Sequence, residues 1–503
     1  MSRDRIVIIG AGMGGLAAAL SLAVQGEEVL VIEAQGAPGG KMRRLTAAGR
    51  DIDGGPTVFT MRWVLDQVFD EAGAALAEHV TLEPLSTLAR HAWSARERLD
   101  LHADLKASAD AIGAFAGAGE ARRFLDFSAE AKRIYQTLER PFLCAQRPNP
   151  VTLAMANGLP GMAAMARINP FETMWKGLGR HFRDPRLRQL FGRYATYCGS
   201  SPFLAPATLM LVAHVEQAGV WTVKGGMHEL ALALEALARR RGVTFRYGEA
   251  ATEVATEGGR VIAVSTATER FDCSAVIVNA DSNAVAEGLL GNAVKRAVAP
   301  VTPQQRSLSA ITWAAVLEAT GFPLARHNVF FSRDYAAEFR TLTTGYPDEP
   351  TVYLCAQDRE GHASGPERLL LLVNSPANGD RAPQPHQRVE LAMRAKLAQC
   401  GLHLDWNPDN IIMTDPARFG SLFPATGGAL YGRASHGWMA SFQRPAAHTA
   451  ITGLYLAGGS VHPGPGVPMA MLSGRLAAQS LMASRASTRR FQSAATVGGI
   501  STA

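Results

Sequence analysis

The feature that most constrains the fold is a glycine-rich turn between a short strand and a helix at the start of the chain. Residues 6–9 are a β-branched run, typical of a strand buried on both faces of a parallel sheet. Glycines at intervals over residues 10–15 lead into a helical run of small and aliphatic residues over 16–24, and a second apolar strand, 29–32, ends at Glu33. This β-α-β unit of about thirty residues predicts a dinucleotide-binding fold.

Each glycine of the pattern Gly10-x-Gly12-x-x-Gly15 has a physical role in such a fold. Gly10 permits the tight turn, Gly12 lets the backbone approach a diphosphate, and Gly15 lets the helix pack closely on the strand. The helix N-terminus directs free N–H groups at the phosphates, and Glu33 is placed to accept hydrogen bonds from a ribose diol. A chance glycine-rich turn is the alternative, but the strands, helix and acid around it argue against that.

Two further segments favour FAD over NAD. Gly39-Gly40-Lys41 follows the acid and offers close backbone approach with a cation, although alone it is also an ordinary turn. Near the C-terminus, an apolar strand over 454–457 leads into a Gly/Pro-rich loop and a helix that begins near Met469. The N-terminus of that helix can stabilise negative charge on a reduced flavin ring. A long FAD molecule stretched across the domain requires such an additional contact region.

Strand and helix patterns return along the chain, with helical and mixed segments between the returns. We therefore predict an α/β fold with a discontinuous Rossmann-like FAD-binding domain and an inserted α+β domain that faces the substrate and the membrane. The FAD-binding domain takes residues 1–75, 218–290 and 426–484, the inserted domain takes 76–217 and 291–425, and 485–503 form a flexible tail.

Composition excludes several other classes of protein. The net charge is +6 and the Lys and Arg residues are scattered, which argues against a nucleic-acid partner. The 5 cysteines are far apart and form no CxxC pair, so we expect no disulfide framework and no metal site. The N-terminus runs directly into a strand and is not a signal peptide, and no uninterrupted apolar run is long enough to cross a bilayer.

Taken together, the motifs resemble those of bacterial phytoene-desaturase-type carotenoid desaturases, a branch of the FAD-dependent amine oxidase superfamily. Within that branch, the residues after Gly40 are most similar to the 1-hydroxycarotenoid 3,4-desaturases, also called methoxyneurosporene dehydrogenases, of purple bacteria. The resemblance rests on the N-terminal glycines, on Asp53-Gly54-Gly55-Pro56-Thr57, on Arg193-Tyr194-Ala195-Thr196-Tyr197 with Gly199-Ser200-Ser201-Pro202, on Gly225-Gly226-Met227, and on His462-Pro463-Gly464-x-Gly466-Val467-Pro468.

The resemblance implies roles for individual residues. The adenosine diphosphate half of FAD is held by Gly10, Gly12, Gly15, Glu33, Gly40 and Lys41. Val254 meets adenine through its backbone, and the ribityl chain and isoalloxazine are surrounded by Gly458, Gly459, Val467, Pro468 and Met469. The sequence departs from many flavoproteins at two of these positions, since Lys41 replaces an arginine and Gly459 replaces an aspartate.

The implied activity is the insertion of a double bond at C3–C4 of an acyclic 1-hydroxy or 1-methoxy carotenoid, in the carotenoid biosynthesis of a photosynthetic bacterium. The reaction removes a hydride, which FAD accepts, and a proton. The implied electron acceptor is a quinone or oxygen. His462 and His228 are weak candidates for a catalytic base, because a structural role is the commoner one for such histidines.

The implied substrate dissolves in lipid, so the enzyme must reach it from a membrane. We expect peripheral attachment to the cytoplasmic side of the bacterial inner, photosynthetic membrane. Residues 148–171 are apolar, with Leu159 and Met162 among them, and Trp175 and basic residues follow; this pattern suits interfacial docking or, equally, a buried helix pair.

Three alternatives stay open at this point. The first is another reaction of the same branch, such as phytoene or neurosporene desaturation or polyene saturation, because the cofactor motifs do not choose the substrate. The second is an amine or protoporphyrinogen oxidase, which the His- and Pro-containing C-terminal loop disfavours. The third is a flavin- or carotenoid-binding protein without activity.

Overall fold

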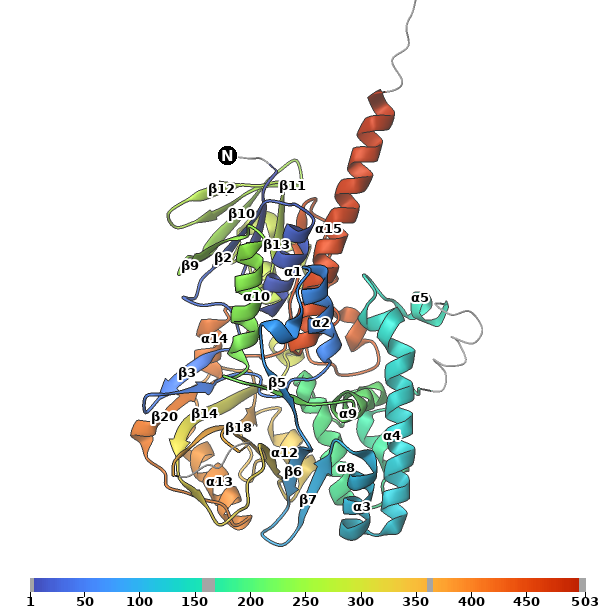
Figure 1. Ribbon diagram of the computed structural model, residues 1–503, viewed down its shortest axis with the longest axis vertical. Helices are drawn as coiled ribbons and strands as arrows, with labels where there is room; N and C mark the ends of the chain where they lie inside the picture. Colours follow the sequence, from blue (N-terminus) through green and yellow to red (C-terminus); the bar gives the residue numbers. More distant parts are fainter. Residues whose placement is uncertain (1–3, 156–167, 360–364, 497–503) are drawn as a thin grey trace, which may run out of the picture.

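The computed structural model describes residues 4–155, 168–359 and 365–496, and its elements form two units (Figure 1). The first unit is built on a five-stranded parallel sheet of order β21-β13-β1-β2-β9. Its strands are β1 (Ile6–Ile9), β2 (Val29–Glu33), β9 (Thr244–Tyr247), β13 (Ala275–Val278) and β21 (Leu454–Leu456). Three widely separated stretches of chain therefore build one sheet, which confirms the discontinuous Rossmann-like fold.

Both faces of this sheet are covered, which explains why β1 is apolar at every position. Ile6 and Ile8 pack in the core of the helical layer, whereas Val7 and Ile9 pack in a second core on the other face. The helical layer contains α1 (Met13–Val24), α2 (Arg62–Glu71), α10 (His228–Arg240) and α15 (Val467–Thr496). The other face carries a small antiparallel sheet of β10 (Ala251–Glu257), β11 (Arg260–Thr266) and β12 (Arg270–Asp272), followed by α11 (Ser282–Ala286).

The second unit is built on a seven-stranded mixed sheet of order β20-β14-β18-β17-β16-β6-β7. The strands are β6 (Thr87–Ala92), β7 (Arg98–His102), β14 (Ser309–Leu317), β16 (His327–Phe330), β17 (Val352–Ala356), β18 (Glu367–Ser375) and β20 (Ile411–Thr414). Two inserted stretches of chain thus meet in one sheet. The hairpin of β3 (Arg44–Ala47) and β4 (Arg50–Asp53) and the pair of β5 (Leu82–Pro84) and β8 (Trp221–Val223) lie between the two units (Figure 1).

The two faces of the second sheet have different partners. Trp313 and Leu371 point to the face covered by α13 (His386–Gln399). Thr312 and Leu372, paired across β14 and β18, point to the opposite face and line a cavity. Residues of α4 (Ala118–Leu138), α5 (Pro150–Met155), α9 (Leu211–Gln217), α12 (Tyr335–Thr341) and α14 (Pro416–Leu422) also line that cavity. The remaining helices of this unit, α3 (Leu105–Ala116), α7 (Met174–His181) and α8 (Pro185–Gly192), do not line it and pack near α4 (Figure 1).

The C-terminal helix corrects one expectation. The sequence predicts a flexible tail over residues 485–503, but α15 continues into this stretch, to Thr496. Ser, Ala and Arg are compatible with a helix even where no apolar face repeats, so the loss of a core pattern does not mark the end of the helix. Within the described ranges, no helix combines the length and the apolar character needed to span a bilayer.

Candidate functional site

A single cavity of about 880 Å³ runs from the carboxyl ends of the parallel strands to the floor of the second sheet. Ten of the twelve residues expected to bind FAD line it: Gly10, Gly12, Glu33, Gly40, Lys41, Gly458, Gly459, Val467, Pro468 and Met469. Ligands of open parallel sheets bind at this edge, where the strand order reverses. The tertiary structure therefore collects residues separated by more than four hundred positions in one place.

At the phosphate end, backbone packing explains the glycines. A Cβ on Gly15 would lie 2.1 Å from the Gly10 carbonyl oxygen, so Gly15 sets the closeness of helix and strand and does not itself line the cavity. Gly12 is the N-cap of α1, without a side-chain cap and without an acidic residue in the first turn. The first N–H groups of the helix are thus left for an anion.

Glu33 is held at the end of β2 by its neighbours. Its carboxylate accepts hydrogen bonds from the N–H of Ala11 at 2.6 Å and from the N–H of Gln35 at 2.8 Å. Burial raises the pKa of Glu33, and these backbone donors oppose the rise. Each oxygen keeps a second lone pair, so the carboxylate can also accept from ribose hydroxyls.

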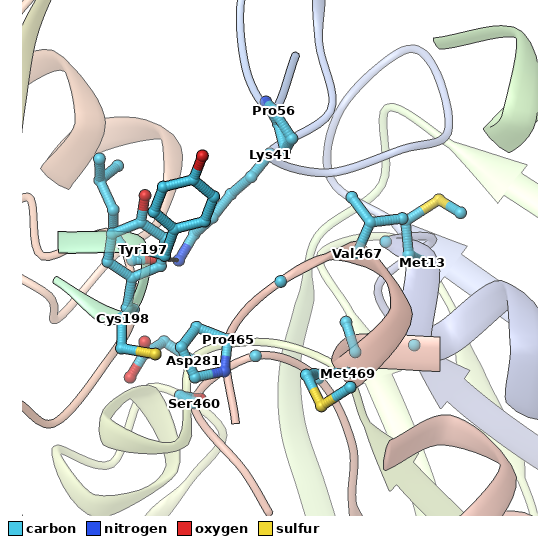
Figure 2. Close-up of a pocket in the computed structure, with 18 of the residues that line it drawn as sticks. Met13, Lys41, Pro56, Tyr197, Cys198, Asp281, Ser460, Pro465, Val467 and Met469 are labelled. Atoms are coloured by element: carbon cyan, nitrogen blue, oxygen red, sulfur yellow. Dashed lines mark hydrogen bonds between the residues drawn. The ribbon is translucent and has the colours of Figure 1, made fainter. Parts of the chain in front are cut away.

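Lys41 points away from the phosphate end. Its Nζ donates to the Leu430 carbonyl at 2.5 Å and lies 5.3 Å from the centre of the Phe423 ring. Burial lowers the pKa of Lys41, while the charge of Asp281 acts in the opposite direction. In Figure 2 the side chain extends toward Tyr197, on the substrate side of the cavity.

The structure corrects the expectation for Val254. Its N–H donates to the Leu290 carbonyl at 2.9 Å, its side chain is buried in the core beneath β10, and it does not line the cavity. Ala250 and Ala251, at the start of the same strand, line the cavity instead, with Leu289 and Leu290. The apolar periodicity of β10 marks Val254 as a core residue, whereas the strand's first residues face the ligand edge.

Neither histidine considered as a base reaches the cavity wall. The Nε2 of His462 lies 3.0 Å from the carbonyl oxygens of Phe142 and Ala145, and burial lowers the pKa of His462 to about 4. The Nε2 of His228 lies 2.9 Å from the Pro38 carbonyl. Both histidines hold neighbouring segments together through hydrogen bonds to backbone carbonyls, so the structure gives them the role of positioning loops that border the cavity.

Sequence reasoning missed a buried polar cluster on the substrate side. The guanidinium of Arg193 lies over the rings of Tyr194 and Tyr197, 5.7 and 5.3 Å from their centres. Both tyrosine hydroxyls donate to the buried carboxylate of Glu216, that of Tyr197 at 2.7 Å. The motif Arg193–Tyr197 was visible in the sequence, but its partner Glu216 carried no local signal.

A second missed contact holds the loop that borders the cofactor end. The Asp53 carboxylate accepts the Met227 N–H at 2.8 Å, and a Cβ on Gly226 would lie 2.8 Å from that carboxylate. Burial raises the pKa of Asp53, and the backbone donors lower it. The two motifs, one around Asp53 and the other around Gly226, therefore contact each other directly in the folded protein.

The cavity fits FAD. It joins an uncapped helix N-terminus, the carboxylate of Glu33, a second helix N-terminus at Val467 and an apolar chamber. One carboxylate oxygen in its wall, Oδ2 of Asp281, is buried without a hydrogen-bond partner among the described residues. Among those same residues, no cluster of His, Cys, Asp and Glu could hold a metal ion.

Fold and site define a flavin-dependent oxidoreductase. The chain matches the flavin containing amine oxidoreductase family over residues 13–482 and belongs to it, with FAD as its cofactor. It is 52% identical to a hydroxyneurosporene desaturase of Rubrivivax gelatinosus over 99% of this chain and 97% of that protein. It is 44% identical to a hydroxyneurosporene desaturase of Cereibacter sphaeroides over 97% of this chain and 99% of that one. Wild-type putrescine oxidase shares the fold, with a TM-score of 0.59 and 17% identity over 95% of this chain and 99% of that one.

Proposed function

We propose that this protein is an FAD-dependent desaturase that introduces the C3–C4 double bond into an acyclic 1-hydroxy or 1-methoxy carotenoid. The observation that carries the proposal is an apolar chamber continuous with the FAD site, in a chain 52% identical to a hydroxyneurosporene desaturase over nearly its whole length. The proposal places the reaction in the carotenoid biosynthesis of a photosynthetic bacterium.

The chamber wall suits a hydrocarbon. Its floor presents Val329, Leu370 and Leu372 from the second sheet, and Leu209 and Val212 cover it from the helical side. Such a wall excludes water and binds an extended polyene through apolar contact. FAD, when bound, supplies the hydride acceptor.

The residues of the chain then position the substrate and handle the proton. Among the described residues, the carboxylates that line the cavity are Glu33 and Asp281, and both lie at the cofactor end. The polyene delocalises the positive charge left by hydride removal, so the proton needs no strong base. The two electrons pass to a membrane quinone or to oxygen in this proposal.

The mouth of the cavity carries exposed apolar side chains. Phe171 and Trp438 line the cavity, their rings are 5.0 Å apart, and their exposed fractions are 74% and 42%. Val151 and Met155 of α5 are exposed nearby at 65% and 68%. Trp175, in contrast, is packed against Phe203. Leu159 and Met162 lie outside the described residues.

We propose that this apolar rim docks on a lipid surface, because a polyene dissolved in the bilayer can then enter the chamber without crossing water. The proposed membrane is the bacterial inner, photosynthetic membrane at its cytoplasmic side, with peripheral attachment.

Phe171→Asp and Val151→Asp should lower binding to anionic liposomes with unchanged FAD content. The matched control is Leu391→Asp, at a leucine of α13 that is 56% exposed, and this variant should bind as the wild type does. Equal loss in all three variants would contradict the docking surface.

The activity test is anaerobic mixing of the FAD-loaded protein with liposomes that carry one polyene each. Hydroxyneurosporene should bleach the flavin absorbance and yield a product with one more double bond, whereas phytoene should not. Bleaching with phytoene or neurosporene instead would replace the proposal with the alternative desaturation. If none of the polyenes bleached the flavin, the enzymatic function would be refuted.

A further inference from the structure

We propose that Asp281 is a cofactor-binding residue whose carboxylate accepts a hydrogen bond from a hydroxyl of the ribityl chain of FAD. The proposal concerns the cofactor alone and does not depend on which polyene the enzyme converts. It starts from a buried carboxylate oxygen that the protein itself leaves without a donor.

The fold places Asp281 beside the C-terminal glycine loop. Strand β13 runs parallel to β21 with Val278 opposite Leu456, and the Ala457 N–H donates to the Val278 carbonyl at 2.9 Å. Continuing that register past the strand ends brings Asp281 opposite Gly459. Side-chain contacts agree, because the Ser282 N–H donates to the Ser460 hydroxyl at 2.9 Å.

A neighbouring loop closes over the same place. A Cβ on Gly432 would lie 2.6 Å from Cβ of Ser460 and 3.6 Å from Oδ2 of Asp281. Asp281, Gly459 and Ser460 all line the cavity, and Asp281 and Ser460 lie next to each other in Figure 2. Residues nearly 180 positions apart in the chain therefore form one section of wall.

The two oxygens of Asp281 have different environments. Oδ1 accepts the Asn283 N–H at 3.0 Å and so caps α11. Oδ2 is shielded from solvent and has no hydrogen-bond partner within the described part of the chain. A buried carboxylate oxygen without a donor is costly, so a ligand that brings a donor is favoured there.

The nearby cations do not meet this need. Nζ of Lys41 donates to the Leu430 carbonyl. The guanidinium of Arg444 donates to the carbonyls of Tyr431, Gly459 and Arg433 at 2.9, 3.1 and 2.7 Å. The two cations are near enough for the charge of Asp281 to oppose the burial that lowers the pKa of each. Asp281 thus faces a positive field without a direct ion pair.

The negative charge of Asp281 determines which part of FAD can lie against its carboxylate. A diphosphate would repel it, and the diphosphate already has its place at the uncapped N-terminus of α1. The ribityl hydroxyls are neutral donors that need acceptors. Gly459 offers no side chain to them, and Asp281, in the turn between β13 and α11, supplies the carboxylate instead.

The test is a calorimetric titration of the apoprotein with FAD and, in a separate experiment, with ADP. Asp281→Ser keeps an N-cap residue for α11 but is too short to present Oδ2 to the cavity. We expect its FAD dissociation constant to rise about 10- to 100-fold, as for the loss of a hydrogen bond to a charged group, with ADP affinity unchanged or tighter. Asp281→Asn, which keeps a cap and an acceptor, should lie between Asp281→Ser and the wild type.

Two controls separate the proposed hydrogen bond to FAD from the loss of a helix cap and from an effect that acts through Lys41. Asp104→Ala removes the cap of α3, away from the cavity, and should leave FAD affinity as in the wild type. In a Lys41→Met background, Asp281→Ser should weaken FAD by the same factor as in the wild type. Equal weakening of FAD and ADP, no weakening of FAD, or disappearance of the effect in the Lys41→Met background would each overturn the proposal.

Discussion

Replacing His462 with alanine tests whether this histidine supports the structure or takes part in the chemistry. The ring is 4% exposed, its Nε2–H donates to two backbone carbonyls, and it meets the Phe142 ring edge-on at 5.1 Å between centres. Loss of the hydrogen bond costs about 1.5 kcal/mol, and loss of ring packing costs about as much again. We expect the free energy of unfolding to fall by about 3 kcal/mol.

The assay compares urea unfolding midpoints of the FAD-loaded wild type and His462→Ala, together with turnover per bound FAD. Because His462 does not line the cavity, turnover per bound FAD should change less than threefold (roughly 0.6 kcal/mol). An unchanged midpoint with turnover lost by a hundredfold or more would refute the structural role and restore His462 as a catalytic group.

The same histidine predicts a pH dependence. Burial lowers its pKa from the ordinary 6.5 to about 4 in the folded protein, so the unfolded chain binds the proton more readily. The resulting stabilisation, about 3 kcal/mol, is fully present above pH 6.5 and is lost as the pH falls toward 4. His462→Gln should remove this part of the acid sensitivity, so the stability gap between wild type and variant should narrow with acidification. A gap that is constant from pH 7 to 4.5 would contradict the reasoning.

Further predictions concern the cofactor turn and the buried polar groups. Gly15→Ala should abolish FAD retention, measured by flavin absorbance after gel filtration, because its Cβ would lie 2.1 Å from the Gly10 carbonyl oxygen. Glu216→Ala should lower stability by about 3–5 kcal/mol in urea unfolding, because it leaves the buried Arg193 cation without its compensating carboxylate. His327, whose pKa burial lowers to about 3, should add to the loss of stability below pH 6.5, and His327→Phe should reduce that loss.

The nucleotide end was predictable from sequence because its parts are neighbours in the chain. The strand, the glycines and Glu33 lie within one β-α-β unit, whose geometry is set by short-range sterics and hydrogen bonds. Val254 was misplaced for a related reason. Periodicity identifies a strand, but it does not say which end of that strand reaches the ligand edge.

The substrate side could not be predicted in the same way. Arg193 and Tyr197 belong to a recognisable motif. The carboxylate that accepts from the hydroxyls of Tyr194 and Tyr197 is that of Glu216, which lies in α9, a helix without a recognisable motif. Likewise, the His462 ring is buried only because the segment around Phe142 packs on the C-terminal loop. These contacts depend on how separate elements dock, which no local pattern records.

The sequence by itself determined the FAD fold, its discontinuous construction and most of the residues that line the cofactor end of the cavity. Hydrophobic periodicity and glycine spacing act over a few turns of chain, so they can be read directly. The tertiary structure decided that the two histidines face loops rather than substrate, and that the second sheet floors an apolar chamber. It also decided that Asp281 lies beside the C-terminal glycine loop, since its neighbour Ser282 is hydrogen-bonded to Ser460. Those outcomes follow from strand register and domain packing, which bring together groups that the chain itself keeps far apart.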